Sequence, residues 1–307
     1  MGYRLFKPAD LPKMMGMQDL PTIRPTTRPN LRKLDLKAAE LRLAALETAL
    51  AGGKGHIPPA FSWADVAVAL FYAGVLQIRP AQPLWNERDR FILSKGHGCL
   101  TLYALLADLG YVDAEELSRF AGKGSLLPGH PDTLIPGVEA CSGSLGHGLG
   151  VGAGMALAGR LDAAPWRVFV LLGDGECNEG SIWEAAMFAG HQRLHNLIAI
   201  VDRNRLGATD FTENSLSLEP LAARFRDFGW EVAECDGHSI GAVADHLQEA
   251  RSRREGKPFA LIANTTKGKS VPFMENSPLW HHRMPKGKEI DVARETLRSI
   301  IAGLQGH

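Results

Sequence analysis

Residues 168–175, with the sequence VFVLLGDG, decide the fold class of this chain. Five consecutive apolar residues, 168–172, have the length and composition of a strand buried on both faces, as strands of parallel sheets are. The Gly-Asp-Gly that follows ends the strand and places Asp174 just beyond it. A helix is expected from about Gly180 to Ala189, so the segment predicts the first half of a strand–helix–strand unit.

The alternation of strands and helices continues on both sides of this segment. Further strands are expected at residues 91–93, 197–201, 230–233 and 259–263. Helices are expected at 31–50, from Ser62 with Asp65 in a capping box, at 100–109, from Asp113, and at 145–160, 219–227, 240–253 and 290–304. This order predicts an α/β protein with a doubly wound parallel sheet flanked by helices.

The first residues differ in composition from the rest. Residues 1–30 contain prolines at positions 8, 12, 21, 25 and 29, which is too dense a spacing for regular helix. We therefore expect an extended N-terminal arm at 1–30, followed by one domain over residues 31–307.

The overall composition excludes several classes of partner. Lys plus Arg equals Asp plus Glu at 34 each, so no net charge favours nucleic acid or an anionic membrane surface. The four cysteines form no CxxC pair, which is typical of reduced thiols. No signal-like apolar run opens the sequence, and no apolar stretch approaches the roughly 20 residues that span a bilayer. We expect a cytoplasmic protein.

Oxygen-bearing side chains follow two of the expected strands. Asp174 follows the strand at 168–172, and Asn204 follows the strand at 197–201. The spacing allows one crossover between them, so the two side chains can lie side by side at the edge where ligands bind in such sheets. A carboxylate and an amide oxygen suit Mg²⁺, which completes its shell with phosphate oxygens and water. The pattern therefore indicates a Mg²⁺–diphosphate site, although Gly-Asp-Gly is also a common turn.

Several ordered motifs then resemble one family. Residues 173–180 (GDGECNEG) and 202–204 (DRN) resemble the thiamine diphosphate motif, which runs from GDG to Asn. The remaining segments look specifically like transketolase: Gly55-His56, RDRFILSKGH at 88–97, PGHP at 128–131, GSLGHG at 143–148, FMEN at 273–276 and Trp280-His281. The resemblance covers roughly residues 35–285 in the right order. It implies the thiamine diphosphate-binding fold, here the diphosphate-binding domain.

The resemblance implies roles for individual positions. As metal ligands it implies the side chains of Asp174 and Asn204 and the backbone carbonyl of Leu206. Residues beside the cofactor would be His97, Gly143, Leu145, Asp174, Gly175, Glu179, Asn204 and His281. Glu179 is similar to a family residue that joins a hydrogen-bond network between paired active sites. Catalytic histidines facing the sugar and the diphosphate would be His56, His97, His130 and His281. Imidazole suits proton transfer near neutral pH. The other histidines at 191, 195, 238 and 246 lie in no motif and are expected to be structural or surface residues.

The resemblance also implies a partner. The second domain of a transketolase supplies the glutamate that activates the cofactor, and no second α/β domain follows here. The chain is thus expected to be the N-terminal subunit of a split transketolase. It would pair with a C-terminal subunit that carries the pyrimidine-binding domain, in an α₂β₂ heterotetramer. The reaction would transfer a two-carbon ketol unit from a ketose, expected to be phosphorylated, to an aldose.

Two other functions remain open at this point. An α subunit of a 2-oxo acid dehydrogenase shares the GDG-to-Asn site, and a non-catalytic cofactor-binding subunit would share the fold. The chain also departs from the family at Cys141-Ser142, where two threonines are usual, and at His282-Arg283, where many relatives have Gly. His282 and Arg283 would bind an anionic substrate group or be solvated.

Overall fold

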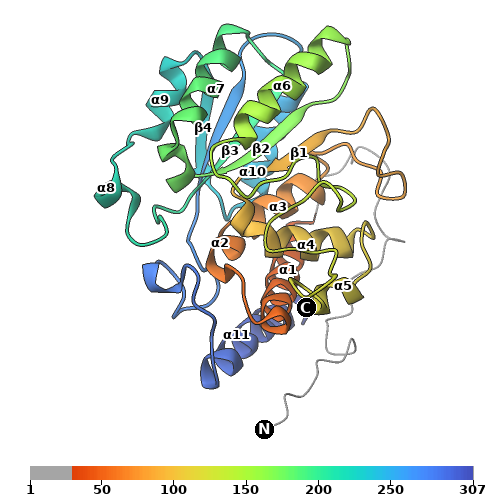
Figure 1. Cartoon of the computed structure of the whole chain (residues 1–307), viewed down its shortest axis with the longest axis vertical. Helices are drawn as coiled ribbons and strands as arrows, with labels where there is room; N and C mark the ends of the chain where they lie inside the picture. The colour runs from red at the N-terminus through yellow and green to blue at the C-terminus, as the bar shows by residue number, and fades with distance from the viewer. Residues whose placement is uncertain (1–29, 307) are drawn as a thin grey trace.

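A five-stranded sheet forms the centre of the molecule. The computed structural model describes residues 30–306. All strand pairs are parallel, in the order β1-β2-β3-β5-β4 (Figure 1). The strands are β1 (Arg90–Leu93), β2 (Val168–Gly173), β3 (Leu197–Arg203), β4 (Glu231–Asp236) and β5 (Phe259–Asn264). All five lie where the sequence predicts them, with shifts of a residue or two at some ends and an extension of β4 to Asp236.

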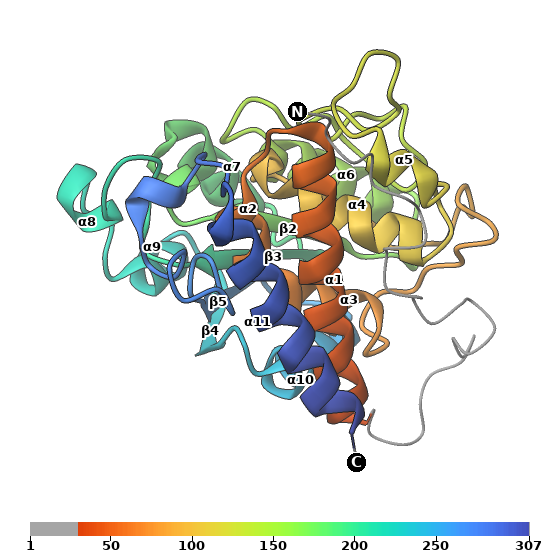
Figure 2. The ribbon, with the colours of Figure 1, turned by 90° about the horizontal axis from the view of Figure 1, so that it is seen from below.

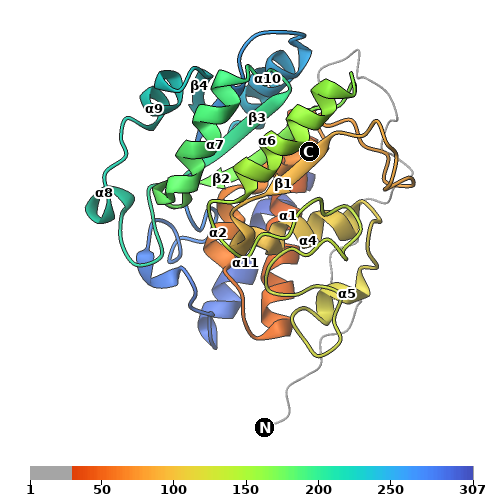
Figure 3. The ribbon, with the colours of Figure 1, turned by 45° about the horizontal axis from the view of Figure 1, so that its top comes forward.

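Helices cover both faces of the sheet, which confirms the doubly wound prediction. One face carries α6 (Gly148–Leu161), α7 (Gly180–His191) and α9 (Leu221–Asp227), as Figure 3 shows. The other face carries α1 (Leu31–Gly52), α2 (Ile57–Ser62), α3 (Ala64–Phe71), α4 (Cys99–Asp108), α5 (Glu115–Ser118), α10 (Ile240–Ser252) and α11 (Lys288–Gln305). A short helix, α8 (Thr212–Ser215), lies in the loop after β3.

The alternation of side chains along β2 explains why its sequence is apolar throughout. Phe169 and Leu171 belong to the core beneath α1, whereas Val168, Val170 and Leu172 belong to the core beneath α6 and α7. Successive side chains of a strand point to opposite faces, so a strand with two covered faces needs apolar residues at every position.

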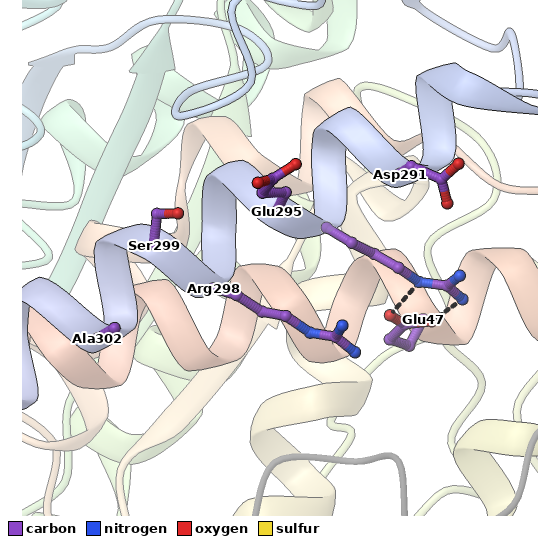
Figure 4. A pocket seen from close by; sticks show the side chains of 7 residues that line it. Glu47, Asp291, Glu295, Arg298, Ser299 and Ala302 are labelled. Carbon is purple, nitrogen blue, oxygen red and sulfur yellow. Dashed lines mark hydrogen bonds and ion pairs between the residues drawn. The ribbon is translucent and has the colours of Figure 1, made fainter.

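The first and last described helices pack against each other in an antiparallel pair. Figure 2 shows α11 lying along α1. Arg32 donates from Nε to the carbonyl oxygen of Leu304 at 2.8 Å, and Arg294 forms a two-pronged ion pair with buried Glu47. A groove of about 680 Å³ runs along this pair (Figure 4). None of the predicted site residues lines it.

In the N-terminal half, one expected element falls outside the described residues and one expected helix cap does not form. The arm expected at 1–30 lies outside the described residues except for Asn30, whose side chain caps α1. The expected capping box at Ser62 is wrong. Ser62 is the last residue of α2. Its hydroxyl donates to Asp202 at 2.5 Å, and the carbonyl oxygen of Pro59 lies 3.0 Å from the same Oγ. The Ser62 hydroxyl is bonded to a buried carboxylate and is therefore not available to cap a helix.

Within residues 30–306, no helix is both long enough and apolar enough to cross a membrane.

Candidate active site

The candidate site lies beyond the carboxyl ends of the strands. Strand β1 leads to Lys95 and His97, β2 to Asp174, β3 to Asn204, and β5 to Lys267. Because all the strands are parallel, these ends share one edge of the sheet, where open α/β sheets bind their ligands.

Asp174 ties the end of β2 to the loop after β3. Its carboxylate accepts the backbone N–H of Gly175 at 2.8 Å and that of Arg205. The side chain is buried, and burial together with the charge of Asp202 raises its pKa to about 6. A Cβ added at Gly175 would lie 3.5 Å from the Cα of Gly207, so the two loops are in contact.

Asn204 is held in the same loop by two hydrogen bonds. Its Oδ1 accepts the backbone N–H of Leu206 at 3.1 Å, and its Nδ2 donates to Asp202 at 3.3 Å. Strands β2 and β3 are neighbours, with Gly173 opposite Asp202, as the sequence argument required.

The donors expected for a metal are oxygens only: one carboxylate, one amide oxygen and the carbonyl of Leu206. No group of three or more His, Cys, Asp or Glu side chains suited to a metal occurs among residues 30–306. A single carboxylate with neutral oxygens is nevertheless the incomplete, hard set that suits Mg²⁺ bound together with a diphosphate.

Two buried lysines at this edge were missed by the sequence analysis. Lys95 forms an ion pair with Asp202, and both side chains are almost fully buried. Burial raises the pKa of Asp202, but Lys95 outweighs that effect and the net pKa is lowered. The sequence did contain a signal for this ion pair. Asp202 is a charged residue within the largely apolar strand β3, and a buried charge needs a partner of opposite charge.

Lys267 is the second of these lysines. Its Nζ donates to the carbonyl oxygens of Leu206 at 3.0 Å and Gly207 at 2.7 Å. Burial, with the charge of Lys95, lowers its pKa to about 7. Nothing around Thr265-Thr266-Lys267 in the sequence distinguished this lysine from a surface residue.

The four predicted histidines form one cluster. His56 precedes α2, His97 lies in the short helix Gly96–Gly98, His130 lies in the loop after α5, and His281 follows the short helix Pro278–Trp280. The ring centroid of His56 is 5.5 Å from His97, 6.4 Å from His130 and 5.2 Å from His281. The centroids of His97 and His281 are 5.4 Å apart.

These imidazoles are neutral near pH 7. Burial first, and then neighbouring positive groups, lower the pKa of His56 to about 4 and that of His281 to about 3. Burial lowers the pKa of His97 well below its usual range and also lowers that of His130. A neutral imidazole has one donor and one acceptor nitrogen. The cluster therefore presents both kinds of polar atom to a bound hydroxyl compound.

The structure separates His282 from Arg283. The His282 ring centroid is 4.6 Å from that of His56, so His282 is a fifth member of the histidine cluster. Arg283 instead stacks on Trp280 at 4.4 Å and pairs with Glu289 at 2.7 Å. Nothing in the sequence distinguished the two residues, and only the fold shows that His282 faces the site.

The loop at 141–147 lies against the segment that carries His97. A Cβ at Gly96 would lie 1.6 Å from the carbonyl oxygen of Ser142, so only glycine fits there. Buried Glu176 accepts the N–H of Gly146 at 2.9 Å and that of Gly173 at 3.0 Å, which fastens the loop to the end of β2.

The remaining predicted cofactor residues lie at the rim of this loop. Gly143 is exposed and Leu145 half-buried. Glu179 is exposed at the start of α7, and it packs closely against Gly146, where an added Cβ would lie 2.6 Å from its own Cβ. Their contact with a cofactor remains a prediction.

Polar atoms are left available around these segments. Ser142 Oγ and His281 Nδ1 are buried and have no hydrogen-bond partner among residues 30–306. Buried polar atoms are normally paired, so each fits a bound polar group. By contrast, His238 lies outside the cluster and is satisfied by Asp65 at 2.6 Å and by the N–H of Thr266 at 2.8 Å, as a structural histidine is.

Comparison with known proteins gives consistent matches. The family described as "Transketolase, thiamine diphosphate binding domain" matches residues 35–299. The chain is 40% identical over 272 residues to one of the subunits of the apulose-4-phosphate transketolase of Phocaeicola vulgatus, covering 89% of this chain and 96% of that protein. It is also 40% identical over 262 residues to the 6-deoxy-6-sulfo-D-fructose transketolase subunit SqwG of a Clostridium species, covering 84% of this chain and 94% of that protein.

Solved structures give the same result for the fold. A transketolase from Pichia stipitis superimposes with a TM-score of 0.81 at 31% identity, covering 89% of this chain and 43% of that one. The chain thus spans less than half the length of that transketolase, but nearly the whole length of the two bacterial proteins above. The matched residues include the strand ends and the histidine cluster, and the chain belongs to the transketolase family, whose thiamine diphosphate-binding domain it carries.

Proposed function

We propose that this chain is the thiamine diphosphate-binding subunit of a two-chain transketolase, which transfers a two-carbon ketol unit from a ketose to an aldose. The observation that carries this is the histidine cluster, in which His56 lies within 6.4 Å of four other imidazoles. The cluster stands at the strand edge that also carries Asp174 and Asn204. Two relatives of similar length are named as transketolase subunits, which supports the two-chain assembly.

The cofactor supplies the carbanion chemistry of the reaction when it is bound, because its thiazolium ring stabilises negative charge on the transferred unit. Asp174, Asn204 and the carbonyl of Leu206 would hold Mg²⁺, which binds the diphosphate. Gly143, Leu145 and Gly175 would line the cofactor pocket. The exposed carboxylate of Glu179 would meet the neighbouring active site in the assembly.

The histidines would orient the sugar and move its protons. Ketol transfer requires protons to leave and reach hydroxyl and carbonyl oxygens of the substrates, and imidazole does this near neutral pH. In this role, His56, His97, His130 and His281 act as donors and acceptors, since their lowered pKa values keep them neutral. His97 and His281 would also contact the diphosphate.

The substrate is proposed to be a ketose with an anionic group, as in the two relatives named for a sugar phosphate and a sulfosugar. His282 would contribute to substrate recognition from its place beside His56. Arg283 is engaged by Trp280 and Glu289 and would not. Of the two possibilities for this pair, binding is thus proposed for His282 alone.

The assembly and its location complete the proposal. Residues 31–307 would form one domain that pairs with a C-terminal subunit carrying the pyrimidine-binding domain, in an α₂β₂ tetramer in the cytoplasm. The partner would supply the glutamate that activates the cofactor.

The test is reconstitution of the chain with a companion that carries the pyrimidine-binding domain. The expected result is ketol transfer from a phosphorylated or sulfonated ketose by the pair, and none by either chain alone. A panel with apulose 4-phosphate and 6-deoxy-6-sulfo-D-fructose would identify the donor class. Turnover by the purified chain alone would refute the two-chain assignment. A folded pair that binds the cofactor but transfers nothing across the panel would favour a non-catalytic subunit.

A further inference from the structure

We propose that Asp202 is a positioning residue that holds the side-chain amide of Asn204 with its oxygen turned toward the metal. The proposal rests on the function above, because it concerns the same Mg²⁺ site. The family resemblance assigned no role to Asp202.

Asp202 lies at the end of β3 and is fully buried. Its Oδ2 accepts from the Ser62 hydroxyl at 2.5 Å, from Asn204 Nδ2 at 3.3 Å and from Lys95. Its Oδ1 accepts from the Thr265 hydroxyl. One carboxylate thus joins four segments: the end of β1, α2, the loop after β3 and the end of β5.

The hydrogen bonds of Asn204 allow only one orientation of its amide. Nδ2 faces a carboxylate, which can only accept, and Oδ1 faces the backbone N–H of Leu206, which can only donate. A flipped amide would place oxygen against oxygen and an NH₂ group against an N–H. Both hydrogen bonds therefore require the same orientation of the amide. A hard cation such as Mg²⁺ can be bound only by the amide oxygen.

Lys95 explains how a carboxylate can be buried at this place. An unpaired charge there would be costly, but the Lys95 ammonium balances it and is itself satisfied by the carbonyl oxygen of Pro59 at 3.0 Å and the Ser62 hydroxyl at 3.3 Å. Replacing Asp202 alone would therefore leave the buried Lys95 ammonium without its ion-pair partner. A useful test must change both residues together.

The experiment compares two double variants of the full chain, K95M/D202L and K95M/D202N, each assembled with the C-terminal partner subunit, as is the wild type. Both lack the ion pair, and replacement of a buried ion pair by residues of similar volume is often tolerated. Only the D202N change keeps an oxygen acceptor for Asn204, because the new NH₂ group can turn to the Thr265 hydroxyl. Mn²⁺ affinity is measured with thiamine diphosphate present, by the paramagnetic resonance signal of free Mn²⁺. Thermal melts check that both variants are folded.

We expect K95M/D202L to bind Mn²⁺ at least about tenfold more weakly than K95M/D202N, the range seen when partners of metal ligands are removed. Thr265→Val, which touches only the other oxygen of Asp202, should leave the affinity within about threefold of wild type. If K95M/D202L does not fold, K95M/D202V takes its place, since a β-branched side chain suits a strand.

Each outcome decides a different claim. Equal Mn²⁺ affinity in the two double variants, with wild type binding normally, would overturn the role of Asp202 and leave the metal site intact. Failure of wild type to bind Mn²⁺ with the cofactor would overturn the proposed metal site itself, and the role of Asp202 with it.

Discussion

The two halves of the candidate site are built in opposite ways. Around Asp174 and Asn204, each side-chain oxygen that would meet a metal is already fixed by a backbone N–H group, and the neighbouring buried Asp202 is paired with Lys95. Around His56, the rings lie 4.6 to 6.4 Å apart and make no hydrogen bonds to one another. The first half is arranged as the proposed metal ion would require. The second leaves its polar atoms available for a ligand that changes during the reaction.

The largest effect is expected in the half around Asp174 and Asn204. Asp174→Ala removes the only carboxylate among the proposed ligands, so we expect cofactor affinity in the presence of Mg²⁺ to fall by more than about 100-fold, beyond the loss typical of an outer residue. Isothermal calorimetry on the assembled pair measures this. Asp227→Ala, at the exposed end of α9, is the control. Unchanged affinity in Asp174→Ala would show that the metal is bound elsewhere.

In the histidine half, a substitution is expected to lower the rate of ketol transfer without weakening cofactor binding. His56→Ala should lower kcat/KM for ketol transfer by about 100-fold or more, the usual contribution of a general acid or base. Cofactor affinity should stay within about threefold. His191→Ala, on the exposed end of α7, should change neither quantity. If His56→Ala weakened cofactor binding as much as turnover, the division between the two halves would not hold.

The histidine half should also make the fold sensitive to acid. The folded pKa of His56, about 4, and of His281, about 3, lie below the unfolded value of 6.5. Above pH 6.5 both rings are neutral in both states. Below it the unfolded chain takes up protons that the folded chain cannot, so stability falls as the pH drops toward the folded pKa values.

The double variant H56Q/H281Q tests this linkage. We expect it to lose less of its melting temperature than wild type between pH 7.5 and pH 5, measured by circular dichroism of the full chain. H191Q serves as the matched control at an exposed position. Parallel pH profiles for H56Q/H281Q and wild type would mean that the cluster is not held neutral by the fold.

The smallest effect is expected at the mouth of the cluster. His282→Ala should raise KM for an anionic ketose roughly three- to tenfold, as loss of one ordinary hydrogen bond does, and leave kcat nearly unchanged. Arg283→Ala should not change KM, because its guanidinium is engaged by Trp280 and Glu289. Steady-state kinetics of both variants with one donor measures the difference. A larger KM effect for Arg283→Ala than for His282→Ala would reverse this assignment.

Local sequence patterns predicted most of the fold. The apolar run before Asp174 predicted a strand buried on both faces, and the structure places its alternate side chains in two separate cores. The expected cap at Ser62 was wrong for an instructive reason. Its hydroxyl bonds to Asp202, which lies 140 positions away in the chain, and no local pattern records such a partner.

The sequence by itself determined the α/β order, the placement of Asp174 and Asn204 at the ends of neighbouring strands, and the motifs that resemble transketolase. These features depend on residue type and short-range spacing, which a linear pattern contains. Only the tertiary structure decided that His282 joins His56 while Arg283 turns away, and that Lys95 and Lys267 are buried beside the predicted ligands. Those contacts join separate loops across one edge of the sheet, and the direction of each side chain follows from packing around it.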